Sequence, residues 1–224
     1  MHALLRHFFY FSSVLPHWRA ILDGFLLTVE MSVLTILVGI PLGLVLAVIR
    51  LLGVKAVNLL VMIYVDVFRA VPQLVIIVIF YFALPYGGIS MGPATATVAA
   101  LSLVLAALAE EIFWASIGAV PKGQWDAGRS TGLGFLSTLR YIILPQAIRM
   151  SVPPLTNRAI GISKSTTLGS VVAAPELLNI TGSLQSNTAN PSFLTVGALL
   201  FILLFLPLVR WSHWLEGQMQ QRKI

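Results

Sequence analysis

Four long apolar stretches constrain the fold of this chain more than any other feature. They cover residues 21–49, 57–84, 93–117 and 193–209. Each is long enough to cross a hydrocarbon core of about 30 Å as a helix. Only 10% of the residues are charged, which is too few to coat a water-soluble globule. The stretches do not alternate polar and apolar residues, and lipid cannot satisfy an open backbone. The sequence therefore predicts an all-α, polytopic membrane protein.

A fifth segment, residues 150–174, is harder to place because prolines and charged residues interrupt it. Positive residues follow the first apolar stretch (Arg50 and Lys55) and the third, and they end the chain (Arg210, Arg222 and Lys223). The loops at 85–92 and 176–192 contain none. Because Lys and Arg collect in cytoplasmic loops, this alternation requires residues 150–174 to cross the membrane as well. Arg6 and Arg19 do not follow the pattern.

The resulting scheme has five transmembrane helices, an N-terminus outside and a cytoplasmic C-terminus. It divides the chain into an outer segment (1–19), a transmembrane domain (20–214) and a cytoplasmic tail (215–224), with a long cytoplasmic loop at about 118–145. The four histidines fall near the two ends of the chain, and there is no cysteine. We therefore predict neither a catalytic centre nor a metal site.

Ionisable side chains inside predicted membrane helices are costly, so they mark candidate functional positions. Asp66 and Arg69 share one helix face, where they could pair with each other. Glu110 and Glu111 lie at the cytoplasmic end of the third helix, and Glu110 could simply mark its boundary. Glu30 lies in the outer half of the first helix, facing a cavity or a partner subunit.

The predicted fourth helix carries two adjacent polar stripes. Residues seven apart lie nearly on one helix face, so Asn157 aligns with Lys164 and Arg158 aligns with Ser165. A helix this polar must line either a water-filled path or a protein interface, and we favour a substrate path. Gly161 and two prolines also allow the helix to bend, as helices at transporter binding sites do.

The first helix carries small residues at four-residue spacing, namely Gly39, Gly43 and Ala47. Such a stripe permits another helix to approach closely.

The loop at about 118–145 contains a turn signal at Pro121 and a short helix over 124–131, ended by Gly132 in a left-handed conformation. That loop is either an ordinary connector or a helical plug for the groove of a soluble partner, with Trp125 and Arg129 available for contact.

The motifs of this loop resemble the EAA loop of ABC-importer permeases, most closely those of the polar amino-acid uptake family. That family reads Ala-Glu-Ile, Val-Pro-Lys-Gly-Gln, Glu-Ala-Ala, Leu-Gly and Ile-Leu-Pro-Gln-Ala. The corresponding residues here are Glu110-Glu111-Ile112, Val120-Pro121-Lys122-Gly123-Gln124, Asp126-Ala127-Gly128, Gly132 and Ile143-Leu144-Pro145-Gln146-Ala147. Tyr64 to Arg69 with Pro72, and Pro153 to Leu155 with Lys164 to Leu168, resemble the family's second- and fourth-helix motifs.

The resemblance implies a permease subunit with the type I ABC-importer fold in a bacterial inner membrane. It implies two ATPase subunits, a second permease chain that is identical or homologous, and an extracytoplasmic solute-binding protein that delivers an amino acid. The chain itself would bind no cofactor, since Lys164-Ser165 lacks the glycines of a phosphate loop. ATP and Mg would be bound by the ATPase. The partners would include membrane lipid but no nucleic acid.

The loop motifs and the polar helix positions together give the candidate site residues. The residues expected to contact the ATPase are Glu111, Val120, Pro121, Gly123, Gln124, Trp125, Asp126, Ala127, Arg129, Gly132, Leu144 and Pro145. The residues expected along the substrate path are Asp66, Arg69, Asn157, Arg158, Gly161, Lys164 and Ser165.

This chain departs from the family pattern at several positions. Asp126 and Gly128 replace the Glu and the second Ala of the EAA motif, and Trp114 stands where the family has Arg. An alternative function remains open from the residues alone. An ion-gradient-driven carrier or channel could use Glu30, Asp66 and Glu111 as a relay, and its energy source would distinguish it from an ATP-driven importer.

Overall fold

The computed structural model describes residues 8–221, with side chains as far as Gln218. Arg6, Arg222 and Lys223, which entered the charge argument, lie outside the described residues. Within that part of the chain every regular element is helical, which confirms the predicted all-α class. The long helices are α2 (Trp18–Arg50), α3 (Lys55–Ala70), α5 (Pro93–Gly118), α8 (Leu144–Ser165) and α10 (Ser192–Gln221).

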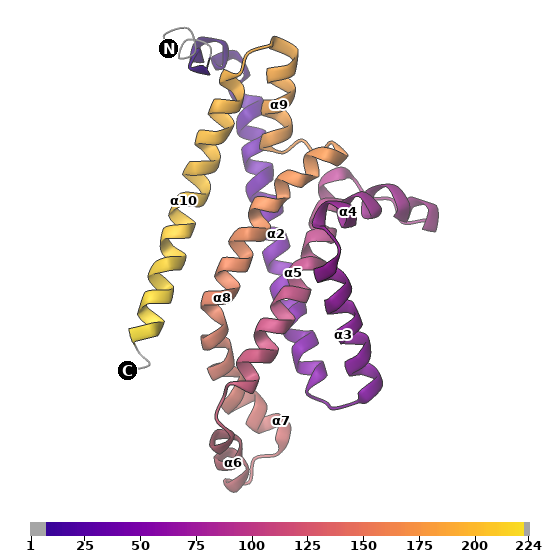
Figure 1. The fold of residues 1–224 in the computed structure, drawn as a ribbon, viewed down its shortest axis with the longest axis vertical. Coiled ribbons are helices and arrows are strands. Elements are labelled where there is room, and N and C mark those ends of the chain that lie inside the picture. The colour runs from indigo at the N-terminus through magenta and orange to yellow at the C-terminus, as the bar shows by residue number, and fades with distance from the viewer. Residues whose placement is uncertain (1–7, 222–224) are drawn as a thin grey trace.

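Short helical segments join these long helices. They are η1 (Phe11–Ser13), η2 (Leu15–His17), α4 (Gln73–Val78), η3 (Ile79–Ala83), η4 (Leu84–Gly87), α6 (Lys122–Ser130), α7 (Phe135–Thr138), η5 (Leu139–Ile143), η6 (Thr166–Val172) and α9 (Leu177–Thr188). Helices α2, α5 and α10 run toward the end of the bundle that carries α6, and α3 and α8 run back (Figure 1). The described ends of the chain therefore lie at opposite ends of the bundle.

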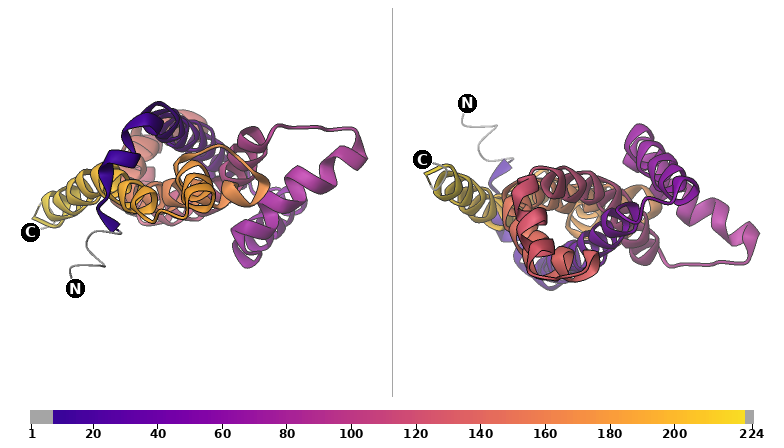
Figure 2. Two further views of the ribbon diagram at one scale, coloured as in Figure 1. Left: turned by 90° about the horizontal axis from the view of Figure 1, so that it is seen from above. Right: turned by 90° about the horizontal axis from the view of Figure 1, so that it is seen from below.

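The second apolar stretch does not form the single helix predicted for residues 57–84. The helices on either side of Val71 and Pro72 meet at an angle of 105°. Pro72 disfavours the helical conformation at the preceding residue, and Val71 is extended with φ −82° and ψ 132°. The segment from α4 to η4 consequently extends sideways from the bundle (Figure 2).

The number of membrane crossings stays a prediction. Among the described residues, three straight helices are long and apolar enough to cross, and the bent pair at Pro72 is a fourth candidate. Helix α8 is not among them, because its polar stripes lower its hydropathy. It nevertheless packs within the bundle against α2, α5 and α10, and it stays helical through Pro153 and Pro154.

Helices α2 and α5 form the most extensive contact in the molecule. A Cβ atom built on Gly43 would lie 2.6 Å from Ala109 Cβ and 2.7 Å from the carbonyl oxygen of Ala106. One built on Gly39 would lie 2.8 Å from Leu105 Cβ. The two backbones can approach this closely only because these positions lack side chains, which confirms the close contact predicted from the small-residue stripe.

The end of the bundle opposite α6 is closed by α9. Glu176, which is fully buried, caps this helix by accepting hydrogen bonds from the backbone N–H groups of Leu178 (2.8 Å) and Asn179 (2.7 Å). Burial raises the pKa of the Glu176 carboxyl, and those two hydrogen bonds oppose the rise. The Leu177 N–H donates to Thr28 Oγ1 at 3.1 Å, so α9 is fastened to the half of α2 that lies away from α6.

The α2–α5 contact predicts a specific cost for adding one methyl group. Gly43→Ala should destabilise the protein by about 1–3 kcal/mol, because the new methyl group would clash with backbone atoms of α5 unless the two helices moved apart. Thermal unfolding in detergent should show a Tm lowered by roughly 2 °C or more. Gly182→Ala is the matched control, since nothing lies within 4 Å of a Cβ there. Equal Tm values for the two variants would contradict the close contact.

Candidate coupling helix and translocation path

Helix α6 lies beyond the ends of α5 and α8 and is stopped by a glycine. Gly132 has φ +84°, a left-handed conformation. The Leu133 N–H donates to the Gly128 carbonyl at 3.3 Å, and the Gly132 N–H donates to the Arg129 carbonyl at 3.0 Å. This pair of bonds is the Schellman ending of a helix. The left-handed stop predicted at Gly132 is confirmed, whereas the helix begins at Lys122 rather than at 124.

The glycine that replaces the second Ala of the EAA motif has a packing role in this chain. Gly128 is buried, and a Cβ there would lie 2.6 Å from Thr138 Cγ2 and 2.8 Å from Ile142 Cδ1. Helix α6 therefore packs directly on α7 and η5 through a residue without a side chain. The departure from the family sequence keeps α6 close to the segment that leads into α8.

The aromatic side chain of α6, Trp125, is half-buried against the protein, so only part of it is exposed for the partner contact that the sequence predicts. The rings of Trp125 and Phe135 stack with centroids 5.4 Å apart and an interplanar angle of 17°. Trp125 also packs against a buried cluster of Ile117, Val120, Leu139, Ile143 and Ala147. Leu144 joins the same cluster, so Val120, Trp125 and Leu144 hold α6 to α5 and α8.

The opposite side of α6 is exposed and carries most of the remaining predicted coupling residues. Those exposed in and around α6 are Pro121, Gly123, Gln124, Asp126, Ala127, Arg129, Gly132 and Pro145. The Gln146 side-chain amide donates to Gln124 Oε1 at 3.2 Å, joining α6 to the first turn of α8. The geometry thus presents a short, rigidly held helix whose outward side is polar.

Two ion pairs fasten the end of α5 from which this loop starts. Arg50 of α2 donates to Glu110 Oε1 at 3.1 Å, and only 1% of the Glu110 side chain is exposed. The Arg50 guanidinium also lies 4.3 Å from the ring centroid of Trp114, within the range of a cation–π contact. Arg50 therefore supplies the counter-charge of a buried carboxylate through Oε1, whereas Glu110 Oε2 has no hydrogen-bond partner among the described residues. Glu110 is thus more than a boundary residue.

The second pair corrects the interaction considered between Asp66 and Arg69. Arg69 of α3 donates to Glu111 Oε1 of α5 at 2.9 Å. Both side chains are well exposed, at 41% and 50%. Asp66 is exposed one turn earlier on α3. Helix spacing alone allowed a pair within α3, but α5 supplies a partner whose carboxylate lies within direct hydrogen-bonding distance.

The polar residues of α8 lie along one exposed side of that helix. Arg158, Gly161 and Lys164 are exposed, and Ser165 is half-buried with its hydroxyl donating to the Gly161 carbonyl at 3.3 Å. Lys164 Nζ lies 5.8 Å from the ring centroid of Phe205. Arg69 pairs with Glu111 of α5 and not with this side of α8. The predicted path residues therefore form two separate groups, one where α3 meets α5 and one along α8.

Asn157 has partners that the sequence did not identify. Its side-chain amide donates to Glu216 of α10, and its carbonyl oxygen accepts from the Ser212 hydroxyl at 2.8 Å. These contacts join α8 to α10. Neither Ser212 nor Glu216 is near Asn157 in sequence, and Arg50 was recognised only as a loop charge, so sequence reasoning had no signal for these pairings.

The described residues contain no group of three or more His, Asp or Glu side chains placed to hold a metal ion. The structure has two notable features: α6 projects from one end of the bundle and is fastened to it, and α8 carries a polar side along the bundle. A membrane-embedded subunit of a transport system needs both features, one for contact with a partner and one for a polar path. The chain belongs to the family described as the binding-protein-dependent transport system inner membrane component, whose model matches residues 39–221.

Individual relatives agree with this assignment. The chain is 32% identical over 216 residues to a probable glutamine ABC transporter permease of Bacillus subtilis (strain 168), covering 94% of this chain and 98% of the relative. It is 37% identical over 160 residues to the L-cystine transport system permease of the same organism, covering 71% and 68%. A crystal structure of an amino acid ABC transporter with histidines matches with a TM-score of 0.83 and 28% identity, covering 93% of this chain and 98% of that one.

These findings confirm the resemblance to ABC-importer permeases and their helical fold. The chain is a multi-pass membrane subunit of an ABC transporter and not an enzyme, because the relatives it matches over most of its length are permease subunits.

The different burial of the two ion pairs predicts different costs of breaking them. Arg50→Ala should cost about 3–5 kcal/mol of unfolding free energy, because it leaves the buried Glu110 carboxylate without its counter-charge. Arg69→Ala should cost less than about 1 kcal/mol, because water screens the exposed pair. Thermal unfolding of the two purified variants measures the difference. Similar Tm losses in both would show that Arg50 does not neutralise a buried charge.

Proposed function

We propose that this chain forms the translocation path of an ATP-driven importer for a polar amino acid. The proposal is supported by the names of its relatives, which include glutamine, cystine and amino-acid permeases. The chain would lie in the bacterial inner (plasma) membrane, with its C-terminus and α6 on the cytoplasmic side. A solute-binding protein would deliver the amino acid from the opposite side.

The observation that carries the proposal is the way α6 is held. Its inner side packs on a buried cluster shared with α5 and α8, whereas its outer side is exposed and polar. We infer that this outer side docks into a groove of an ATPase subunit, which binds ATP and Mg. Movement of the ATPase would then displace α6 together with α5 and α8. ATP must bind one state of the complex better than the other for this to drive transport.

The exposed polar side of α8 is the proposed substrate path. Arg158, Gly161 and Lys164 cannot face lipid without a large cost, so a second permease chain, identical or homologous, would lie across the path from them. Arg158 is the candidate for binding the substrate carboxylate, which would favour neutral or acidic amino acids over basic ones. Ser165, Asp66 and Arg69 would have supporting positions.

The left-handed stop of α6 provides a test of coupling. Gly132→Val should uncouple ATP hydrolysis from uptake, because a β-branched residue is strained at φ +84° and the helix end must shift. In proteoliposomes with the ATPase and the binding protein, we expect uptake per ATP hydrolysed to fall at least about fivefold. A fivefold change corresponds to about 1 kcal/mol, the scale of strain stored in an unfavourable backbone conformation.

The matched control is Gly134→Val, two residues later. Gly134 has φ −67° and ψ 168°, which valine adopts readily, and nothing lies within 4 Å of a Cβ there. This variant should retain coupling. An unchanged uptake-to-ATP ratio for Gly132→Val in a normally assembled complex would contradict the docking role of α6.

Substrate recognition is tested separately at Arg158. Arg158→Ala should weaken the uptake affinity by roughly tenfold or more, since a charge-assisted hydrogen bond contributes about 1.5–3 kcal/mol. Concentration-dependent uptake measures this change. Arg210→Ala removes an exposed cation from α10 instead and should leave the affinity unaltered. If Arg158→Ala retains both the affinity and the selectivity of the wild type, Arg158 does not bind the substrate.

A further inference from the structure

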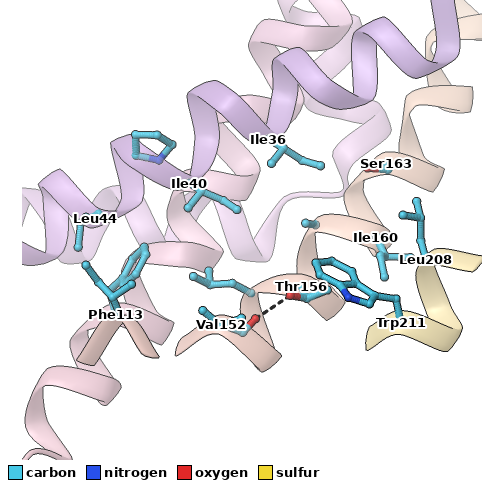
Figure 3. Close-up of a pocket in the computed structure, with 14 residues that line it drawn as sticks. Ile36, Ile40, Leu44, Phe113, Val152, Thr156, Ile160, Ser163, Leu208 and Trp211 are labelled. Carbon is cyan, nitrogen blue, oxygen red and sulfur yellow. Dashed lines mark hydrogen bonds between the residues drawn. The ribbon is translucent and has the colours of Figure 1, made fainter. Parts of the chain in front are cut away.

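A cavity of about 510 Å³ lies between α2, α8 and α10, away from the residues assigned to coupling or to the path. Its walls are almost entirely aliphatic and aromatic, with Ile40 of α2, Ile160 of α8 and Trp211 of α10 facing one another across it (Figure 3). The Thr156 hydroxyl in its wall already donates to the Val152 carbonyl at 2.8 Å. The cavity therefore offers little hydrogen bonding to a polar ligand such as an amino acid.

The cavity lies on the side of α8 opposite its polar stripe. Val152, Leu155 and Ala159 line the cavity, and they recur at the three- and four-residue spacing that defines one helix face. Arg158, Gly161 and Lys164 recur on the other face and are exposed. A second permease chain that covers the polar stripe would consequently leave the cavity uncovered.

The surfaces beside the cavity are those of a lipid-facing protein. Pro41 of α2, which lines the cavity, is exposed, and the lining residues Leu208 and Trp211 of α10 are 37% and 53% exposed. Exposed apolar side chains of this kind on helices long enough to cross a membrane are expected to contact acyl chains. The opening between these two helices therefore faces the hydrocarbon of the bilayer.

The shape and the charge at one end also match a phospholipid. The lining residues of α8 run from Ile148 to Ser163, about 22 Å along the helix, which is more than half of a hydrocarbon core about 30 Å thick. Arg149, an exposed cation, precedes Val152 and Thr156 by three and seven residues, so it lies on the cavity side near the α6 end. Basic positions between helices on the cytoplasmic side are suited to lipid headgroups.

We propose that one acyl chain of a phospholipid from the α6-side leaflet occupies this cavity, with its phosphate near Arg149. Cavities lined by aliphatic and aromatic side chains bind apolar ligands in preference to water. The lipid would fill the space between α8 and α10 beside the contact that Asn157 makes with Ser212 and Glu216. It would thus hold α10 at a fixed distance from α8.

Native mass spectrometry of the full chain, purified from membranes and delipidated in the presence of phosphatidylglycerol, tests the proposal. Each wild-type chain should retain one more bound phospholipid than each chain of the Ala159→Phe variant. In that variant, the phenylalanine ring fills the cavity from its α8 wall. Ala159→Leu is a smaller filling variant if the phenylalanine is not tolerated. Leu203→Phe places the same ring on the exposed side of α10 and should retain the lipid. Equal lipid retention by all these chains would overturn the proposal.

A second measurement tests whether another copy of the chain occupies the cavity. The chain has no cysteine, so Thr156→Cys introduces a single thiol at the cavity wall. In phospholipid vesicles, we expect no disulfide-linked dimer on oxidation and strong quenching of a bimane label at this position by brominated phosphatidylglycerol. A disulfide-linked dimer, or a label that the brominated lipid does not quench, would contradict occupation by an acyl chain. Both outcomes are independent of ATP-driven uptake and of the role of α6.

Discussion

The close contact between α2 and α5 is the constraint on which the rest of the structure depends. In a bilayer, helices gain little from burying apolar surface against one another, because lipid is equally apolar. Packing must therefore supply the attraction, and it does so where Gly39 and Gly43 remove the side chains that would separate the two backbones. The buried Arg50–Glu110 pair continues this contact to the end of α5, where the chain leaves the bundle to form α6.

This arrangement makes α2 a support for the loop that carries α6 as well as for the bundle. Val48 of α2 and Leu51, the residue that follows this helix, pack against the cluster that also contacts Trp125 of α6. At the opposite end of the same helix, Thr28 accepts a hydrogen bond from the backbone of Leu177 in α9. One rigid helix therefore contacts both the projecting loop and the segment that closes the other end. Helix α6 is therefore attached to closely packed helices, and a displacement of α6 should also displace them.

Local sequence signals predicted the local structure well. The left-handed stop at Gly132, the short helix before it and the small-residue stripe of α2 all follow from backbone conformation and side-chain size, which neighbouring residues determine. The bend at Pro72 was missed because apolar content was weighted above the restriction that proline places on Val71. The partners of Glu110, Glu111 and Asn157 could not be predicted, because each lies on another helix and depends on how the helices pack. The packing of Trp125 against the bundle could not be predicted for the same reason, since its place in the sequence does not reveal which side of α6 meets the bundle.

The central claim is that this subunit forms the substrate path and that a separate ATPase, acting through α6, moves the helices that line the path. The most direct measurement is uptake of radiolabelled amino acid into proteoliposomes that contain the permease with or without its ATPase subunits and binding protein. The account predicts accumulation only when the ATPase, the binding protein and ATP are all present, and no effect of collapsing an ion gradient. Accumulation driven by an ion gradient in vesicles that contain the permease alone would contradict it.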